Sequence, residues 1–440
     1  MNIAKMNTVK SWLRSFAPTN RKEASESIIE NMLLHWFPAK VFGRSFSFSY
    51  SFWLGTISMS LFVIMTITGV LLMFLYIPSL ERAYWTMKDI DYVVSYGWLL
   101  RGVHRMAAHF MVAVVFFHLV RTFYTAAYRS SPRMARADRR VNWIIGNVLL
   151  VLTLALSYTG YLLPWDQLAY WALIIGANVA QSTPLVGDTV RELLVGGTEI
   201  GQNALLRFYI LHCVALPLLL VIAFAFHMWR IRKDGGLACV DAAVERSGDT
   251  LREPARDKSY LLLGAPEGTR YTVTTSEFLD PGHFIPANPL LVKRIAWVFG
   301  FTLAFTVLCA CLFKMPLEAP ANPAVAPNPA KAPWYFLWLQ ELIADTTVRI
   351  GGITLNGGFI GGVLIPAVCL LAAMVWPYVD RSPPDAIGVW FHRSRWLQNA
   401  VFTVVVLAII ALIYVAAFLR GPNWILYPPG APWPKEPPLF

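Results

Sequence analysis

Apolar residues along the chain gather into seven long runs that polar segments separate. Each run holds about 20 residues, the length at which an α-helix crosses the hydrocarbon core of a bilayer. The runs are Trp53–Ile77, Val103–Tyr124, Trp143–Leu163, Leu205–Trp229, Ile295–Phe313, Gly357–Trp376 and Gln398–Leu419. This pattern predicts an all-α integral membrane protein with seven transmembrane helices.

The composition agrees with a membrane as the main solvent. Hydrophobic residues make up 56% of the chain and charged residues only 14%, whereas soluble domains carry about 25% charged residues. The 17 Trp and 17 Tyr are typical of aromatic belts at the two membrane interfaces. The net charge of +11 is then better explained by Lys and Arg in cytoplasmic loops than by nucleic-acid binding.

Basic residues concentrate in four of the segments outside the runs. These are the N-terminal segment and the segments after the second, fourth and sixth runs. The residues are Lys5, Lys10, Arg14, Arg21 and Lys22, then Arg129, Arg133, Arg136, Arg139 and Arg140, then Arg230, Arg232 and Lys233, and finally Arg381, Arg393 and Arg395. Seven crossings put all four segments on one side, which the positive-inside rule makes cytoplasmic. We expect a multi-pass protein of a bacterial inner membrane with a cytoplasmic N-terminus.

The polar segments also predict how the chain is divided. Residues 1–50 form a cytoplasmic N-terminal segment, in which Ile28–Phe37 have the amphipathic pattern of a membrane-surface helix. Residues 51–233 hold the first four spans, residues 234–292 form a polar cytoplasmic linker, and residues 293–440 hold the last three spans.

Histidines in the second and fourth runs form two matched pairs. His104 and His118 are 14 residues apart, and His212 and His227 are 15 apart, which is about 21–22 Å along an α-helix. At about 100° per residue, each pair lies roughly on one face of its helix. Because both runs cross the membrane in the same direction, His104 and His212 share the outer level, and His118 and His227 share the inner level.

Two layers of paired imidazoles predict two haems, each with iron held by both histidines of its layer. A single buried histidine more often only hydrogen-bonds a neighbouring helix, and His109, which lies outside the pattern, fits that explanation. One metal ion cannot bind ligands that lie about 21 Å apart. Glycines support the haems, because Gly55 and Gly69 in the first run, and Gly146 and Gly160 in the third, are also 14 residues apart. Glycine omits the side chain where a flat macrocycle would collide.

Three segments near these residues resemble the cytochrome b/b6 family of quinol:cytochrome c or plastocyanin oxidoreductases. They read Gly-Trp-Leu-Leu-Arg-Gly-Val-His-Arg at 97–105, Gly-Tyr-Leu-Leu-Pro-Trp-Asp-Gln at 160–167 and Arg-Phe-Tyr-Ile-Leu-His at 207–212. The resemblance is close over residues 40–235 and looser over 290–420. The 15-residue histidine gap and the seven spans resemble the b6 type with its subunit IV fused behind it, since the mitochondrial type has an eighth span and a gap of 14.

The resemblance implies non-covalent b haems of different potential. The low-potential haem is implied at His104 and His212, and the high-potential haem at His118 and His227. Arg101 and Arg105 flank the outer ligand and fit either haem propionates or snorkelling interfacial arginines.

The resemblance also implies two quinone sites. Tyr161, Pro164 and Trp165, after the third span, match the family's outer quinol-oxidising site, together with Trp334 and Tyr335 between the fifth and sixth spans. The inner quinone-reducing site is implied beside the inner haem, where Arg232 matches a basic residue of the family.

Two positions depart from the family pattern. The family usually carries Pro-Glu-Trp-Tyr before the sixth span, and its Glu is thought to accept a quinol proton. Here residues 332–335 read Ala-Pro-Trp-Tyr, so Pro333 stands in place of the carboxylate. Glu341 could substitute, water could carry the proton, or Glu341 could be an ordinary surface residue. The b6 type also binds an extra haem through a Cys where this chain has Trp53, so no third haem is expected.

The function implied is that of a di-haem cytochrome b subunit of a bc-type complex, a quinol:cytochrome c oxidoreductase that couples electron transfer to proton translocation. The five Cys form no iron–sulfur or c-type haem motif, so a Rieske-type iron–sulfur subunit and a c-type cytochrome are expected as partners in a dimeric complex. The alternative is a di-haem, quinone-reactive membrane anchor of a dehydrogenase, which generally lacks the Gly-Tyr-Leu-Leu-Pro-Trp loop and three further helices. A transporter with histidine proton relays would leave the glycine pairs unexplained.

Overall fold

The computed structural model describes residues 48–129, 138–234 and 284–431, and, nearer the N-terminus, residues 15–19, 23, 24, 26, 27, 31, 34 and 40–42. Within this part of the chain, seven helices are long and apolar enough to cross a membrane. They are α4 (Leu54–Met73), α6 (Gly97–Tyr124), α7 (Arg139–Leu162), the continuous run of α10 (Gln202–Ile210), η4 (Leu211–Ala215) and α11 (Leu216–Lys233), α13 (Ala287–Leu312), the run of α15 (Gly357–Phe359), η6 (Ile360–Leu364) and α16 (Ile365–Val379), and α17 (Trp396–Tyr414) with η9 (Val415–Leu419). They confirm the seven predicted spans, with ends shifted by a few residues.

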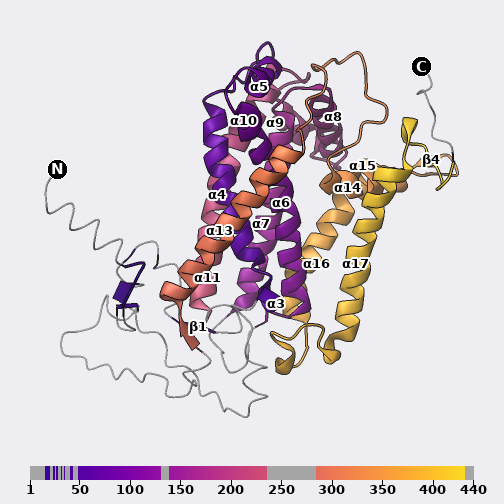
Figure 1. Ribbon diagram of the computed structural model, residues 1–440. Helices are drawn as coiled ribbons and strands as arrows, with labels where there is room; N and C mark the ends of the chain where they lie inside the picture. Colours follow the sequence, from indigo (N-terminus) through magenta and orange to yellow (C-terminus); the bar gives the residue numbers. More distant parts are fainter. Residues whose placement is uncertain are drawn as a thin grey trace.

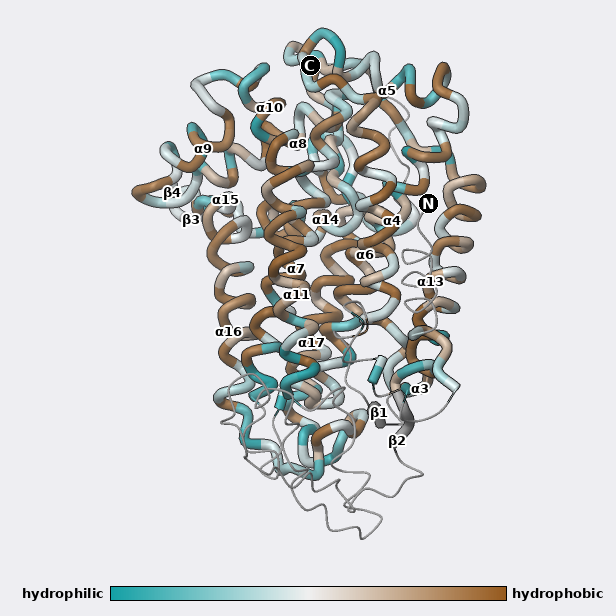
Figure 2. Tube along the Cα trace, turned by 90° about the vertical axis from the view of Figure 1, so that its left-hand side faces the viewer, coloured by the Kyte–Doolittle hydropathy of each residue, from teal (hydrophilic) through white to brown (hydrophobic). Residues whose placement is uncertain are grey.

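The long helices stand side by side (Figure 1). Hydrophobic residues fill the middle of the helices, and hydrophilic residues gather toward both ends (Figure 2). Large apolar side chains point outward, and Phe301 and Val404 are 70% and 65% exposed. Lipid accepts such surfaces, while each helix satisfies its own backbone hydrogen bonds. The fold is therefore that of a multi-pass integral membrane protein.

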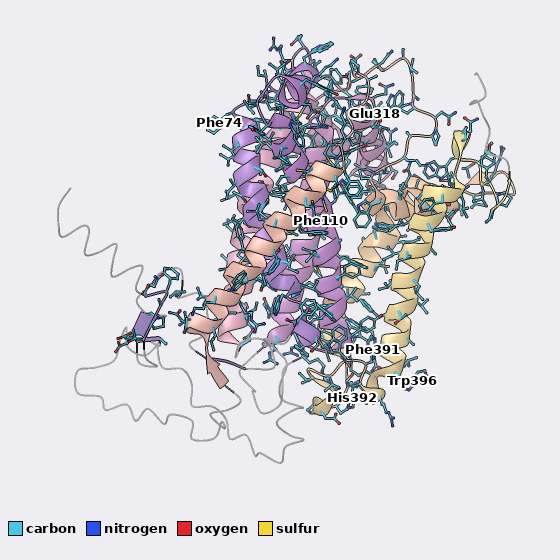
Figure 3. The ribbon with its side chains drawn as sticks, in the orientation of Figure 1. Phe74, Phe110, Glu318, Phe391, His392 and Trp396 are labelled. Atoms are coloured by element: carbon cyan, nitrogen blue, oxygen red, sulfur yellow. The ribbon has the colours of Figure 1, made fainter. Side chains whose placement is uncertain are left out.

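The two ends of the helices need names. We call the end with residues 125–129, 230–234 and 380–395 the inner end, and the opposite end the outer end. Figure 3 labels His392 at the inner end and Glu318 at the outer end.

The helices α4, α6, α7 and α11 form a four-helix bundle, in which α4 packs against α6 and α7 against α11. Helix α13 packs across α4 and α6 (Figure 1). Where it crosses α6, a Cβ added at Gly102 would lie 3.3 Å from the Cβ of Ala310, so small residues let the two backbones approach closely. Helix α16 packs against α7, and α17 packs against a short helix, α14.

Several short elements connect the spans, and the hydrophobic pattern does not predict them. Four short helices lie toward the outer end (Figure 1), and even the longest of them, with 15 residues, is too short to span a bilayer. They are α5 (Ala83–Tyr92), α8 (Gln167–Gln181), α9 (Gly187–Val195) and α14 (Trp334–Thr346). The remaining pieces are α3 (Phe48–Ser51), the 3-10 turns Pro384–Ala386, Arg393–Arg395 and Pro422–Trp424, and two antiparallel strand pairs, β1 (Lys40–Phe42) with β2 (Phe284–Pro286) and β3 (Arg349–Ile350) with β4 (Ile353–Thr354).

Two predicted parts fall mostly outside the described residues. Of the amphipathic run Ile28–Phe37, only Asn31 and Leu34 are described, and residues 235–283 of the 234–292 linker are not.

A buried polar cluster joins the B–C and F–G connections at the inner end. The side chain of Arg395 is 0% exposed and donates hydrogen bonds to the carbonyl of Phe123, at 2.8 Å, and to the Tyr128 hydroxyl, at 2.7 Å. Tyr128 in turn donates to Asp380 Oδ2 at 2.6 Å. Because Arg395 and Asp380 are both removed from solvent, their charges depend on each other and on these hydrogen bonds.

Removing the carboxylate from this cluster should destabilise the fold. Asp380→Ala leaves the Arg395 charge buried without its partner, which costs about 3–5 kcal/mol. Asp385→Ala, in the same connection, removes an exposed carboxylate 3.6 Å from His392 and should cost less than about 1 kcal/mol. Thermal unfolding of the detergent-solubilised protein compares the two variants, and equal midpoints would contradict the role of the cluster.

The cluster should also lose its effect in acid. Burial raises the pKa of Asp380, but hydrogen bonds from Ser382 and Tyr128 and the charge of Arg395 outweigh it and hold the pKa below its ordinary value. The stabilisation is then complete above the unfolded pKa of about 4 and falls as the pH drops through the folded pKa. We expect the difference between wild type and Asp380→Ala to be constant from pH 6 to pH 8 and to shrink only below about pH 4.

Candidate functional site

The outer histidine pair lies between α6 and the fourth span. The rings of His104 and His212 have centroids 6.3 Å apart and planes inclined by 81°. Two metal–nitrogen bonds of about 2 Å each, together with the inner radii of the two rings, fill such a distance. One iron atom therefore fits between the rings.

Hydrogen bonds select the nitrogen that each outer ring can offer to a metal. The Thr68 hydroxyl donates to the carbonyl of Ile64 at 2.7 Å, and its oxygen lies 2.9 Å from His104 Nδ1. Since its proton is already used, Thr68 accepts from Nδ1–H, and the lone pair of His104 is left on Nε2.

The opposite ring is held in the same way. Thr159 Oγ1 donates to the carbonyl of Ala155 at 2.9 Å, so it accepts from His212 Nδ1 at 3.2 Å. The Leu156 carbonyl also lies 3.1 Å from this nitrogen. His212 therefore also keeps its lone pair on Nε2, the tautomer that a metal ligand requires.

A wide helical turn explains the unequal histidine spacing. In a regular α-helix, 15 residues overshoot four turns by about 60°. His212 lies in η4, a π-helical turn over Leu211–Ala215, which takes up one extra residue. The 15-residue gap to His227 therefore places its rings much as the 14-residue gap from His104 to His118 does on α6.

The inner pair faces a cavity. His118 on α6 and His227 on α11 both line a cavity of about 300 Å³, together with Gly55, Gly146 and Arg121. This volume reaches the range of cofactor sites, which is about 300–1,000 Å³.

Each of the four histidine rings lies against one glycine of a neighbouring helix. A Cβ added to these glycines would meet Cε1 of His118 at 3.3 Å, of His104 at 3.1 Å and of His227 at 4.0 Å, and would collide with the His212 ring. The respective glycines are Gly55, Gly69, Gly146 and Gly160. The missing side chains thus leave room for the rings and for a flat group between them, so the residues present fit two haems.

A bare metal ion has no comparable site in the described part of the chain, where no group of three His, Cys, Asp or Glu side chains could hold one. The paired rings therefore suit an iron that a macrocycle already holds.

The two loops expected to form the outer quinone site are joined directly. Trp165 is buried, and its carbonyl accepts from the backbone N–H of Ala321 at 3.2 Å. Asp166 Oδ1 caps α8 through the N–H of Ala169 at 2.9 Å, and Asp166 Oδ2 accepts from the N–H of Glu318 at 3.1 Å. These bonds hold the loop after α7, including Pro164, against the loop before α14.

Aromatic residues from both loops meet near α6. Tyr161 lies within electrostatic range of Arg105 and Tyr335. Burial raises the pKa of Tyr335 to about 12, against the opposing charge of Arg105, so its hydroxyl stays protonated. Trp334 lies beside Tyr335 and donates its indole N–H to Nδ1 of His109 at 3.1 Å.

The sequence analysis assigned His109 only to helix packing and missed its contact with the Ala-Pro-Trp-Tyr stretch. The available signal was an ionisable residue at membrane depth. Its partner Trp334, however, is 225 residues away in the chain.

Two other predicted site residues have partners that the sequence does not reveal. Arg101 is buried and pairs with Asp91 at 2.5 Å, and its guanidinium also donates to the carbonyl of Pro316 at 2.8 Å. Glu341 is 1% exposed and accepts a bidentate pair of hydrogen bonds from Arg420 at 2.6 and 2.9 Å. Glu341 is therefore no surface residue, and its carboxylate is neutralised within the protein.

The remaining predicted residues lie at the inner end. Arg232 is partly buried near the end of α11. Trp53 lines the inner cavity just before α4, and the Arg294 guanidinium lies 5.2 Å from the centroid of its ring. The roles of Arg101, Arg105 and Arg232 toward cofactors remain predictions.

A membrane bundle with two layers of glycine-backed histidines is the architecture of a haem-binding membrane cytochrome. Known proteins agree with this class. The family model described as Cytochrome b/b6/petB matches residues 42–235, and the model described as Cytochrome b(C-terminal)/b6/petD matches residues 320–427.

Individual relatives give the same result. Cytochrome b6 of Heliomicrobium gestii is 38% identical over 184 residues, which are 42% of this chain and 83% of that protein. Cytochrome b6 of Prochlorococcus marinus strain NATL1A is 40% identical over 182 residues, which are 41% of this chain and 80% of that protein. A chain of the solved structure "Hyperthermophilic respiratory Complex III" has a similar fold, with a TM-score of 0.64 and 23% identity over 88% of this chain and 87% of that chain.

The chain belongs to the cytochrome b/b6 family, with a b6-like part fused to a subunit IV-like part. It is accordingly a haem-binding protein of membrane electron transport.

Two glycines of α7 give a matched test of the haem pockets. Gly160→Ala places a methyl group against Cε1, Nε2 and Nδ1 of His212, whereas Gly146→Ala places one at an ordinary contact distance of 4.0 Å from His227. We expect Gly160→Ala to lose the outer haem and Gly146→Ala to keep both. Reduced-minus-oxidised spectra, normalised to protein, measure the haem content, and equal content in the two variants would contradict this assignment.

Proposed function

We propose that this protein is the di-haem cytochrome b subunit of a bc-type complex that oxidises quinol at the outer face and reduces quinone at the inner face. The observation that carries the proposal is the pair of histidine layers, one of which has an iron-sized gap of 6.3 Å between ring centroids. A bound b haem supplies one-electron transfer, and two haems at different depths let an electron cross the membrane.

The residues of the chain hold the two haems and separate their levels. His104 and His212 bind the outer haem through Nε2, and His118 and His227 bind the inner haem. Moving one electron across the membrane potential costs roughly 2.3 kcal/mol per 100 mV, so the inner haem needs the higher potential. Arg121 lines the inner cavity, and a positive charge there favours the reduced state.

The outer quinone site lies where the loops after α7 and before α14 meet. Tyr161, Pro164, Trp165, Trp334 and Tyr335 belong to these joined segments. Glu341 is a weak candidate for the proton acceptor, because its carboxylate is already bound by Arg420. The inner quinone site is proposed beside His118 and His227, near Arg232.

The proposed complex needs partners to complete the electron path. The chain has no c-type haem motif and no iron–sulfur motif, so a Rieske-type subunit and a c-type cytochrome would supply these centres, probably an arrangement that the dimeric complexes of the family use.

 The structural neighbour, a chain of a solved respiratory Complex III, supports this assignment through its fold. We place the complex as a dimer in a bacterial inner membrane, with the inner end and the N-terminus on the cytoplasmic side.

The four proposed parts of the chain follow the same division. Residues 51–233 hold both haems, residues 293–440 complete the outer quinone site, and residues 1–50 and 234–292 lie on the cytoplasmic side.

Removing one outer ligand tests the proposed function. His104→Ala should remove the lower-potential haem and spare the inner haem, because His118 and His227 lie in a separate layer. A redox titration of the purified complex counts the haems and orders their potentials. A variant that keeps both haems, or a wild-type protein with a single haem, would refute the assignment.

A further inference from the structure

The proposed outer site lacks the carboxylate that its family places before Trp334, because Pro333 stands there. Two buried carboxylates of the outer end are already engaged. Glu341 is held by Arg420, and both oxygens of Asp166 accept backbone N–H groups. Quinol oxidation releases protons, so the site requires another acceptor.

An imidazole lies directly beside the incomplete stretch. His109 follows His104 by five residues on α6, which turns it about 140° away from the haem-facing direction. It faces α14, where the Trp334 indole donates to its Nδ1 at 3.1 Å and the Tyr335 ring packs against it with centroids 5.6 Å apart.

The hydrogen bond from Trp334 shows which atom of His109 can accept a proton. An indole N–H can only donate, so Nδ1 carries the lone pair and Nε2 carries the hydrogen in the neutral ring. Trp334 is 41% exposed and is the first residue of α14, so its indole covers the imidazole from the outside. A quinol hydroxyl is a donor of the same kind and can replace it at Nδ1.

We propose that His109 is the proton acceptor of the outer quinol site, and that the quinol hydroxyl displaces the Trp334 indole from Nδ1. This inference rests on the proposed function and adds a catalytic residue to it.

The proton and electron balance is simple. One quinol O–H bond breaks and its proton forms an N–H bond at Nδ1, while the second hydroxyl proton goes to water at the outer end. The two electrons leave to two one-electron acceptors of the complex, an iron–sulfur cluster and the outer haem, and quinol becomes quinone.

The surroundings of His109 favour release of the proton afterwards. Arg105 lies one turn toward the outer end on α6, and its guanidinium donates to the carbonyl of Pro316 at 3.0 Å. Its positive charge repels an imidazolium one turn away. Tyr335, the titratable group that faces His109 from α14, stays protonated and adds no charge.

The test uses the purified complex with a short-chain quinol as substrate. We expect His109→Gln to keep both haem spectra and both potentials but to oxidise quinol about 100-fold more slowly, the contribution of a positioned general base. Adding Pro333→Glu to this variant restores a carboxylate at the family position and should recover at least tenfold. His392→Gln, at the inner end, is the matched control and should leave the rate unchanged.

The pH profile separates proton transfer from packing. The rate of the wild type should fall in acid as His109 becomes protonated, and in the rescued double variant this fall should move to lower pH, because a carboxyl titrates about two units below an imidazole. If His109→Gln fails to retain haem, Pro333→Glu alone decides, since its second base should extend activity to lower pH.

Three results would overturn the proposal. They are a His109→Gln rate within twofold of wild type, a loss that Pro333→Glu does not recover, and a rescued variant or Pro333→Glu protein whose pH profile matches that of wild type. A wild-type complex that holds both haems but does not oxidise quinol would instead refute the proposed function, and this inference with it.

Discussion

The gap between paired imidazole rings sets the arrangement of the first four spanning helices. The outer rings must stand 6.3 Å apart with their Nε2 lone pairs facing each other, inside a bundle whose helices otherwise pack closely. Thr68 and Thr159 meet the first requirement by fixing Nδ1. Glycines on α4 and α7 meet the second, because they leave space beside each ring without moving the helices apart.

The features that the sequence predicts are those with a direct physical period. Bilayer thickness sets the length of the seven spans, and helical geometry places histidines 14 residues apart at two depths. The short outer helices have no such signal, because segments of 9 to 15 residues resemble buried loops. The same limit applies to contacts between distant residues. Glu341 meets Arg420 79 residues later, and no local pattern reveals that its carboxylate is neutralised.

The family relatives place the b6-like part in a protein of its own, since cytochrome b6 matches only 41–42% of this chain. Here the two parts are fastened at both ends of the membrane. Asp166 binds the backbone of the later loop at the outer end, and Arg395 binds Tyr128 at the inner end. Both fastenings involve buried charge, which binds strongly only when every partner is in place. Such contacts favour one relative placement of the two parts over others.

The wide turn at Leu211–Ala215 bears on how haem proteins of this kind are compared. A count of residues between two ligands measures distance only while the helix between them is regular. Where a π turn intervenes, one residue is added without lengthening the path in proportion, so sequences with gaps of 14 and 15 can hold their irons equally far apart. Electron tunnelling depends on that separation, and an added residue need not slow it.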